Sequence, residues 1–191
     1  MSRPADPSLP LRILAAAHAL WSEGGEASVT IRDVAKKAST TTPSVYAHFE
    51  DRAAIVRGVR RLARARFEAA LARSGGFADG CRRVLDFVDQ YPRDYELLFG
   101  YGYRDRAEKG VQDAELSGFE THIRAAGVPE RQVRLTALAI ASLLHGAAMF
   151  RLAHESPGVL WQERRKAALD ACASLIAQRQ PAGREGDRRR R

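Results

Sequence analysis

The side chains that could do chemistry in this chain are concentrated in residues 30–52. Several of them fall on the outward side of one short predicted helix, and all can form hydrogen bonds: Thr41, Thr42, Ser44 and Tyr46. Hydroxyl groups presented in this way can contact the phosphate oxygens and base edges of DNA. The segment therefore points to nucleic-acid recognition.

Two short predicted helices position these side chains. The run Thr30-Ile31-Arg32-Asp33 resembles a capping box and begins a helix that continues to Lys37. After a tight break at residues 38–40, a hydroxyl cap and an early proline begin a second helix that ends near Phe49. We expect a small apolar core made of Val34, Ala35, Ala38, Val45 and Phe49. Two helices with a three-residue turn form a helix-turn-helix unit, whose second helix fits a major groove about 12 Å wide.

The rest of the chain is also predicted to be helical, because Ala, Leu, Arg and Glu dominate and no segment alternates with a period of two. The expected helices cover residues 9–23, 52–73 (capped by Asp51), 77–90, 95–99, 111–126, 129–153 and 157–179. The fold class is therefore all-α. We expect an N-terminal three-helix DNA-binding domain (1–52), a connecting helix (about 52–73), a C-terminal ligand-binding and dimerisation domain (74–180) and a disordered tail (181–191).

Composition excludes several classes of protein. Of the 191 residues, 45% are hydrophobic and 28% are charged, as in globular proteins, and a net charge of +8 suits a polyanionic partner. Cys81 and Cys172 match no metal-binding spacing, so we interpret them as small buried hydrophobes. The most apolar stretch, Leu135 to Phe150, is 16 residues long. It is shorter than the roughly 20 residues of a membrane span and is predicted to be a buried helix.

No secretory signal is recognisable, and we expect a cytoplasmic protein without a membrane partner. No GxSxG, HExxH or phosphate-binding loop is present, and Gly100-Tyr101-Gly102 belongs to no complete dinucleotide fingerprint. We therefore expect no enzyme activity, no metal and no cofactor.

At this point the sequence resembles the TetR family of bacterial transcriptional regulators. Two blocks at the family's spacing carry the resemblance: Thr30-Ile31-Arg32-Asp33-Val34-Ala35-Lys36-Lys37-Ala38 and Val45-Tyr46-Ala47-His48-Phe49-Glu50-Asp51-Arg52. The chain departs from the family pattern in two places. The turn reads Ala38-Ser39-Thr40 where a glycine and an aliphatic residue are usual, and Arg52 stands where a lysine is usual.

The resemblance implies roles for individual residues. Residues 41–44 would enter the groove, Tyr46 and His48 would contact phosphates, and Arg52 would approach another phosphate. Lys36 and Lys37 are added because they are basic and lead into the turn. The predicted DNA-binding set is Thr30, Lys36, Lys37, Thr40, Thr41, Thr42, Pro43, Ser44, Tyr46, His48 and Arg52. The alternatives are that Tyr46 is a core aromatic and His48 a solvated surface histidine.

The C-terminal half is less informative. Residues 91–99 and Ser142-Leu143-Leu144-His145-Gly146 look like the TetR-type subgroup named for a Trp-x-x-His-Gly-like signature, with Ser142 in place of the tryptophan. Such domains bind ligands and pair through their last two helices. Candidate ligand-binding residues are Phe99, Tyr101, Tyr103, Phe119, His122, His145, Met149 and Phe150; the alternative for each is plain core packing.

The function expected from these features is that of a homodimeric regulator, a repressor that a small-molecule inducer releases from a palindromic double-stranded DNA operator. Two alternatives stay open. One is a DNA-binding dimer without an inducer, and the other is a helical small-molecule-binding protein or enzyme that no longer binds DNA.

Overall fold

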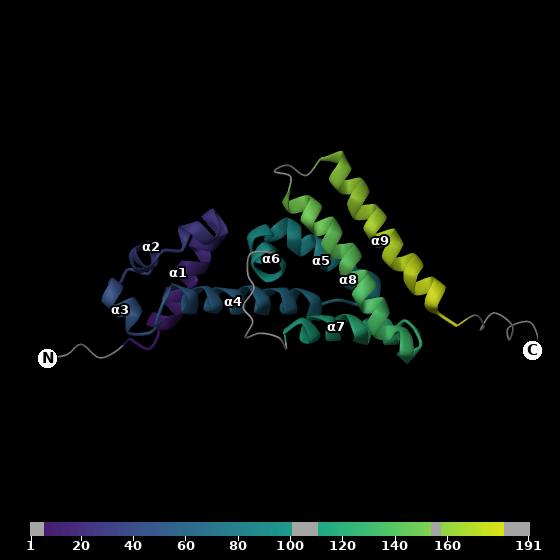
Figure 1. Ribbon diagram of the computed structural model, residues 1–191, viewed down its shortest axis with the longest axis horizontal. Helices are drawn as coiled ribbons and strands as arrows, with labels where there is room; N and C mark the ends of the chain where they lie inside the picture. Colours follow the sequence, from purple (N-terminus) through teal and green to yellow (C-terminus); the bar gives the residue numbers. More distant parts are fainter. Residues whose placement is uncertain (1–5, 101–110, 154–157, 182–191) are drawn as a thin grey trace, which may run out of the picture. The chain divides into compact units, whose positions relative to one another are not determined.

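The computed structural model describes residues 6–100, 111–153 and 158–181. Every regular element in these ranges is a helix, so the all-α prediction is confirmed (Figure 1). The elements are α1 (Leu9–Gly24), the 3-10 helix η1 (Glu26–Ser28), α2 (Ile31–Lys37), α3 (Thr42–Tyr46), α4 (Arg52–Ala72), α5 (Phe77–Gln90), α6 (Pro92–Phe99), α7 (Val111–Ala125), α8 (Glu130–Leu152) and α9 (Val159–Arg179). The predicted tail beyond Pro181 lies outside the described residues.

The predicted helices agree with the observed ones to within a few residues. The first exception is α3, which ends at Tyr46 rather than near Phe49. The second is α6, which begins at Pro92 rather than near Tyr95, because a proline in the first turn of a helix sacrifices no hydrogen bond. The element that the sequence does not signal is η1.

The described residues form two compact units. The first contains residues 6–68 and 91–100, and the second contains residues 69–90, 111–153 and 158–181. Helix α6 therefore belongs to the N-terminal unit, although the expected boundary assigned it to the C-terminal domain. The chain leaves the first unit within α4 and returns to it between α5 and α6.

The first unit is built around α1. Ile13, Ala17 and Trp21 form its buried face, at steps of four residues. Gly25 ends the helix as predicted, with φ +68°, and its N–H donates to the Trp21 carbonyl at 2.8 Å. This left-handed backbone conformation favours glycine because it has no Cβ.

The second unit packs α5, α7, α8 and α9 together, with α8 and α9 side by side (Figure 1). Its largest fully buried side chains are Leu85, Phe87, Ile123, Ile140, Leu144 and Trp161. Helix α8 also carries exposed leucines, since Leu135 is 65% and Leu138 43% exposed. The single chain thus leaves part of the apolar surface of α8 uncovered.

Among the described helices, α8 is the one whose length and composition would also allow it to cross a membrane. Of the most apolar 18-residue stretch of α8, 39% is buried within the protein. A core helix of a soluble protein gives the same signal. The interpretation of residues 135–150 as a buried helix therefore holds for one side of α8 and not for the other.

The two cysteines lie on α5 and α9, and both are buried as predicted. The sequence does not reveal that they meet. The Cys81 thiol donates a hydrogen bond to the Cys172 sulfur, which together with burial raises the pKa of Cys81. Because the thiolate is the reactive form of cysteine, this thiol is protected from alkylation and disulfide exchange.

We therefore expect a thiol reagent such as Ellman's reagent to label the native protein at least about a hundredfold more slowly than the urea-unfolded chain. Absorbance at 412 nm would follow the reaction, and both cysteines would react once the chain unfolds. Rapid labelling of either thiol in the native protein would contradict the buried pair.

Candidate nucleic-acid interface

Helices α2 and α3 both begin with a threonine cap. The Thr30 hydroxyl oxygen accepts from the Asp33 N–H at 3.1 Å, and the hydroxyl donates to the Asp33 carboxylate. The Thr41 hydroxyl oxygen accepts from the Ser44 N–H at 3.3 Å and lies 2.9 Å from the Ser44 hydroxyl. These bonds satisfy backbone donors that would otherwise lack a partner at the helix starts. Thr30, Thr41 and Ser44 thus set the positions of the two helices, whatever else they bind.

The turn between α2 and α3 contains a residue in the left-handed conformation that is not a glycine. Ser39 has φ +53° and is the one described non-glycine residue with a positive φ. Its N–H donates to the Lys36 carbonyl at 3.2 Å, and the Thr40 N–H donates to the Ala35 carbonyl at 2.9 Å. This pair of bonds is a Schellman motif, which normally places glycine at the left-handed position. The turn that departs from the family pattern therefore closes in the ordinary way, with strain at Ser39.

We expect Ser39→Gly to stabilise the protein by about 1 kcal/mol, because glycine adopts this φ without steric cost. The melting temperature should rise by about 2–4 °C for a chain of this size. Thermal unfolding followed by circular dichroism would measure the shift. Ser39→Ala is the matched control, since it removes the hydroxyl and keeps the strain. An equal gain in the alanine variant would show that the hydroxyl, and not φ, is responsible.

Arg52, predicted to approach a phosphate, has a second role within the chain. Its Nε donates to the Val29 carbonyl at 2.7 Å, and Nη2 donates to the Glu26 carbonyl at 2.6 Å. Nη1 lies 3.3 Å from the Glu26 carboxylate. The guanidinium therefore holds the start of α4 against η1 and against Val29, the residue that follows η1. A lysine has a single ammonium and cannot reproduce this fork of donors.

The predicted DNA-binding residues thus divide into two groups. Side chains of the first group form hydrogen bonds or ion pairs within the chain: Thr30, Lys37, Thr41, Ser44 and Arg52. Lys37 belongs to it because its ammonium lies 2.6 Å from the Glu23 carboxylate on α1. The second group is exposed and, within the part of the chain that the structure describes, forms no side-chain hydrogen bond or ion pair: Lys36, Thr42, Tyr46 and His48. Pro43 is exposed beside them, and Thr40 is half-buried.

The exposure of Tyr46 distinguishes the two predictions for its ring, a phosphate-contacting surface residue or a core aromatic. Its side chain is 56% exposed, so it is a surface residue and not part of the core. Val45, its neighbour, is fully buried and anchors α3, whereas Phe49 is half-buried. The short helix therefore buries one side and presents the Thr42 and Tyr46 hydroxyls on the other, and the exposed His48 imidazole follows just after its end. Groups of this kind can donate to phosphate oxygens.

The candidate ligand-binding residues do not all lie in one unit. Phe99 belongs to the first unit, where its ring centroid lies 5.3 Å from that of Phe67. Tyr101 and Tyr103 lie outside the described residues. The remaining candidates lie on α7 and α8, which pack against each other: Phe119, His122, His145, Met149 and Phe150.

Two histidines of this second group have distinct surroundings. The His122 ring nitrogen Nε2 lies 2.8 Å from the Ser74 hydroxyl. Burial lowers the pKa of His145, which favours the neutral imidazole. Among the described residues, no three or more His, Cys, Asp or Glu side chains gather to hold a metal ion.

The fold and the exposed face of α3 define an all-α protein with an N-terminal helix-turn-helix domain. Residues 13–59 match the family described as bacterial regulatory proteins, tetR family. The N-terminal region of this chain is therefore similar to bacterial regulatory proteins of the tetR family. No match was found among curated proteins.

Solved structures share the fold over almost the whole chain. The multidrug binding protein EbrR, complexed with imidazole, has a TM-score of 0.70 at 22% identity and covers 96% of each chain. A TetR transcriptional regulator from Streptomyces coelicolor has a TM-score of 0.68 at 19% identity, over 93% of this chain and 100% of that chain. A TetR variant from Acinetobacter baumannii AYE in complex with minocycline has a TM-score of 0.61 at 18% identity, over 87% and 93%. At these identities the likeness concerns the fold.

Proposed function

We propose that this protein is a homodimeric transcriptional repressor of the bacterial cytoplasm. It binds a palindromic operator through α2 and α3 of each protomer and is released by a small molecule bound in the C-terminal unit. The observation that carries the proposal is the exposed set of Lys36, Thr42, Tyr46 and His48 on a capped helix-turn-helix. Among the residues that the structure describes, these side chains form no hydrogen bond or ion pair, so their polar groups are available to a partner.

Binding would rest on phosphate contacts more than on base readout. The outward face of α3 carries no Arg, Asn or Gln, which are the side chains that read bases with two hydrogen bonds. Thr42 and Pro43 can supply a hydroxyl contact and apolar packing against thymine methyl groups. Sequence-dependent DNA shape would supply the rest of the specificity.

The dimer would form through α8 and α9. Leu135, Leu138 and Leu143 of α8 are exposed on the single chain, and Ser142 and Gly146 lie exposed on the same helix. Small residues let two helices approach closely, and leucines beside them provide apolar area. A second copy is the partner that meets the same surface twice about a two-fold axis, as a palindromic operator requires.

The ligand site would lie between α7 and α8. Buried Phe119 and half-buried Met149 supply apolar surface there, and His122 and His145 supply polar groups, a mixture common in small-molecule sites. The complexes of EbrR with imidazole and of a TetR variant with minocycline support a ligand role for this fold.

A gel-shift titration with the DNA immediately upstream of the protein's own gene tests the proposal. Binding that survives excess unrelated competitor DNA is expected, followed by release when a screened small molecule is added. Binding that competitor DNA abolishes would leave only non-specific attraction to a basic chain. Specific binding that no ligand reverses would favour a DNA-binding dimer without an inducer.

A further inference from the structure

The two cysteines of the chain meet inside the C-terminal unit. Cys81 lies on α5 and Cys172 on α9, each is 1% exposed, and the two thiols share a hydrogen bond. The sequence contains two cysteines in all, so neither thiol has a different cysteine of the chain to pair with. Both residues belong to the same compact unit. A bond between them would therefore form within that unit alone.

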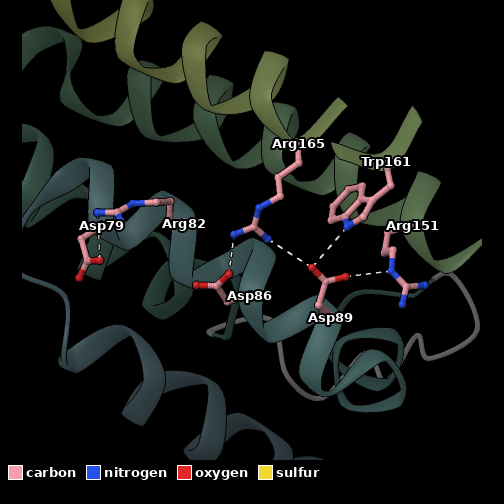
Figure 2. A network of polar contacts seen from close by, with 7 residues as sticks. All are labelled: Asp79, Arg82, Asp86, Asp89, Arg151, Trp161 and Arg165. Atoms are coloured by element: carbon pink, nitrogen blue, oxygen red, sulfur yellow. Dashed lines mark hydrogen bonds and ion pairs between the residues drawn. The ribbon is translucent and has the colours of Figure 1, made fainter. Parts of the chain in front are cut away.

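Polar contacts fix how α9 lies along α5 (Figure 2). The Trp161 indole N–H donates to the Asp89 carboxylate at 3.3 Å, and the Arg165 guanidinium donates to Asp86, one turn earlier on α5. Later residues of α9 thus lie beside earlier residues of α5, so the two helices are antiparallel. The cysteines continue this order, about two turns further along α9 and between one and two turns back along α5. The register of the two helices therefore brings the sulfur atoms together.

The two sulfur atoms have different chemical characters. The hydrogen bond that the Cys81 thiol donates to the Cys172 sulfur lowers the pKa of Cys172 and raises the pKa of Cys81. Cys172 is therefore the sulfur that more readily becomes a thiolate, the nucleophilic form of cysteine. Cys81 retains its proton and stays in contact with that nucleophile. Disulfide formation needs two such groups, because one sulfur is oxidised first and the second then displaces the oxygen.

Burial determines which oxidant can reach the two sulfur atoms. Side chains about one turn away on each helix are buried and apolar: Val84 and Leu85 on α5, and Ala168 and Ile176 on α9. Such surroundings disfavour charged reagents, and the burial of both thiols excludes molecules as bulky as Ellman's reagent. Hydrogen peroxide is neutral and only slightly larger than water. It is therefore the kind of oxidant that these surroundings admit.

We propose that Cys81 and Cys172 form a reversible disulfide site that is oxidised by hydrogen peroxide. The Cys172 thiolate attacks one peroxide oxygen, so that an S–O bond forms and the O–O bond breaks, which gives a sulfenic acid and a hydroxide that takes up the proton lost by Cys172. The Cys81 sulfur then attacks the Cys172 sulfur. The S–S bond forms, the S–O bond breaks, and the departing hydroxide leaves with the Cys81 proton as water. The two thiols together lose two electrons, and one peroxide is reduced to two water molecules.

The bond would lock α9 to α5 within one protomer. A disulfide is about 2.05 Å long, shorter than the contact between hydrogen-bonded sulfur atoms, so oxidation draws the two helices together. It also closes a loop of about 90 residues, which restricts the unfolded chain. Since α9 is one of the helices proposed for the dimer, oxidation is an input to that helix besides the proposed ligand. The disulfide itself does not depend on the proposed function.

Treatment of the native full-length protein with hydrogen peroxide tests the site. After the peroxide is removed, the chain is unfolded in urea with N-ethylmaleimide and weighed by mass spectrometry. We expect a chain lighter by two hydrogen atoms that carries no alkyl group, a peptide map that joins Cys81 to Cys172, and recovery of both thiols with dithiothreitol. The melting temperature of the oxidised protein should lie about 10 °C above that of the reduced protein. The proposal fails if the native protein keeps two alkylatable thiols, or if the disulfide joins two protomers.

Two serine variants separate the roles of the two sulfur atoms, and circular dichroism verifies that each variant is folded. Cys81→Ser keeps a hydroxyl donor beside Cys172 but removes the second thiol, so a sulfenic acid should accumulate and react with dimedone. Cys172→Ser leaves Cys81 with its proton, and Cys81 should stay reduced at the same peroxide concentration. The wild-type protein should give no dimedone adduct, because Cys81 displaces the oxygen as soon as it is attached.

Two outcomes of the variant series would overturn the assignment. One is a dimedone adduct in the wild-type protein, which would show that Cys81 does not reach the oxidised sulfur. The other is an equal adduct in both serine variants, which would show two ordinary thiols with no division of roles. All of these readouts concern a single chain without DNA or ligand, so failure of the proposed function would leave them unchanged.

Discussion

Tyr46→Ala and His48→Ala should each weaken operator binding about a hundredfold. Tyr46 is the last residue of α3 and His48 follows it closely; both side chains are exposed and have no side-chain hydrogen bond or ion pair to lose within the described part of the chain. A hydrogen bond to a charged phosphate contributes about 1.5–3 kcal/mol, roughly tenfold or more in affinity. Two half-sites of a dimer would each lose one such bond. Gel shifts across a salt series, with circular dichroism to verify folding, would measure the effect.

Two variants that each lose one positive charge test whether DNA affinity depends on the helix-turn-helix or only on the net charge of the chain. Lys36→Ala and Arg73→Ala each remove one positive charge, but Lys36 lies on α2 and Arg73 lies in the other unit. We expect Lys36→Ala to lower the slope of log K against log salt by about 1 per half-site, as loss of one phosphate contact does. Arg73→Ala should bind like the parent protein. Equal losses in both variants would indicate attraction to net charge alone.

Leu138→Glu should convert the proposed dimer into a monomer. The change would bury two unpaired carboxylates, one from each protomer, in an apolar interface, and each costs several kcal/mol. Since about 1.4 kcal/mol is tenfold, the dimer dissociation constant should rise at least a thousandfold. Light scattering after size-exclusion chromatography would then report one chain of 21.1 kDa in place of two.

The matched control for that variant is Leu11→Glu on α1, where the leucine is 69% exposed. It introduces the same charge on an exposed helical leucine of the other unit and should leave the mass unchanged. A dimer that persists in Leu138→Glu would place the interface elsewhere. Loss of the dimer in Leu11→Glu would show that the added charge, rather than the site, disrupts association.

Local signals made the helix-turn-helix predictable. The caps at Thr30, Thr41 and Asp51 are hydroxyl or carboxyl groups within three residues of the N–H that they accept from, so the sequence alone contains both partners. The glycine pair before α5 and the Tyr91-Pro92 break after it are also local signals, and they predicted its observed bounds. The assignment of residues to the exposed face of α3 also followed from spacing within one helix.

The contacts that tie distant segments together could not be predicted. His18 and Asp94 are 76 residues apart in the chain, as are Arg165 and Asp89. No local pattern distinguishes such carboxylates from the many that face solvent. For that reason the sequence assigned α6 to the C-terminal domain, and it revealed neither the internal hydrogen bonds of Arg52 nor the meeting of Cys81 and Cys172.

In the proposed dimer, the exposed leucines of α8 make the amount of active regulator a nonlinear function of its synthesis. The apolar surface of a newly made chain would be covered by a second chain, so the stability of the chain would rise with its own concentration by about 1.4 kcal/mol per tenfold. Below the dissociation constant, dimers vary as the square of the protomer concentration. Halving the rate of synthesis would then remove about three quarters of the dimers, which turns gradual dilution into a steep change in operator occupancy.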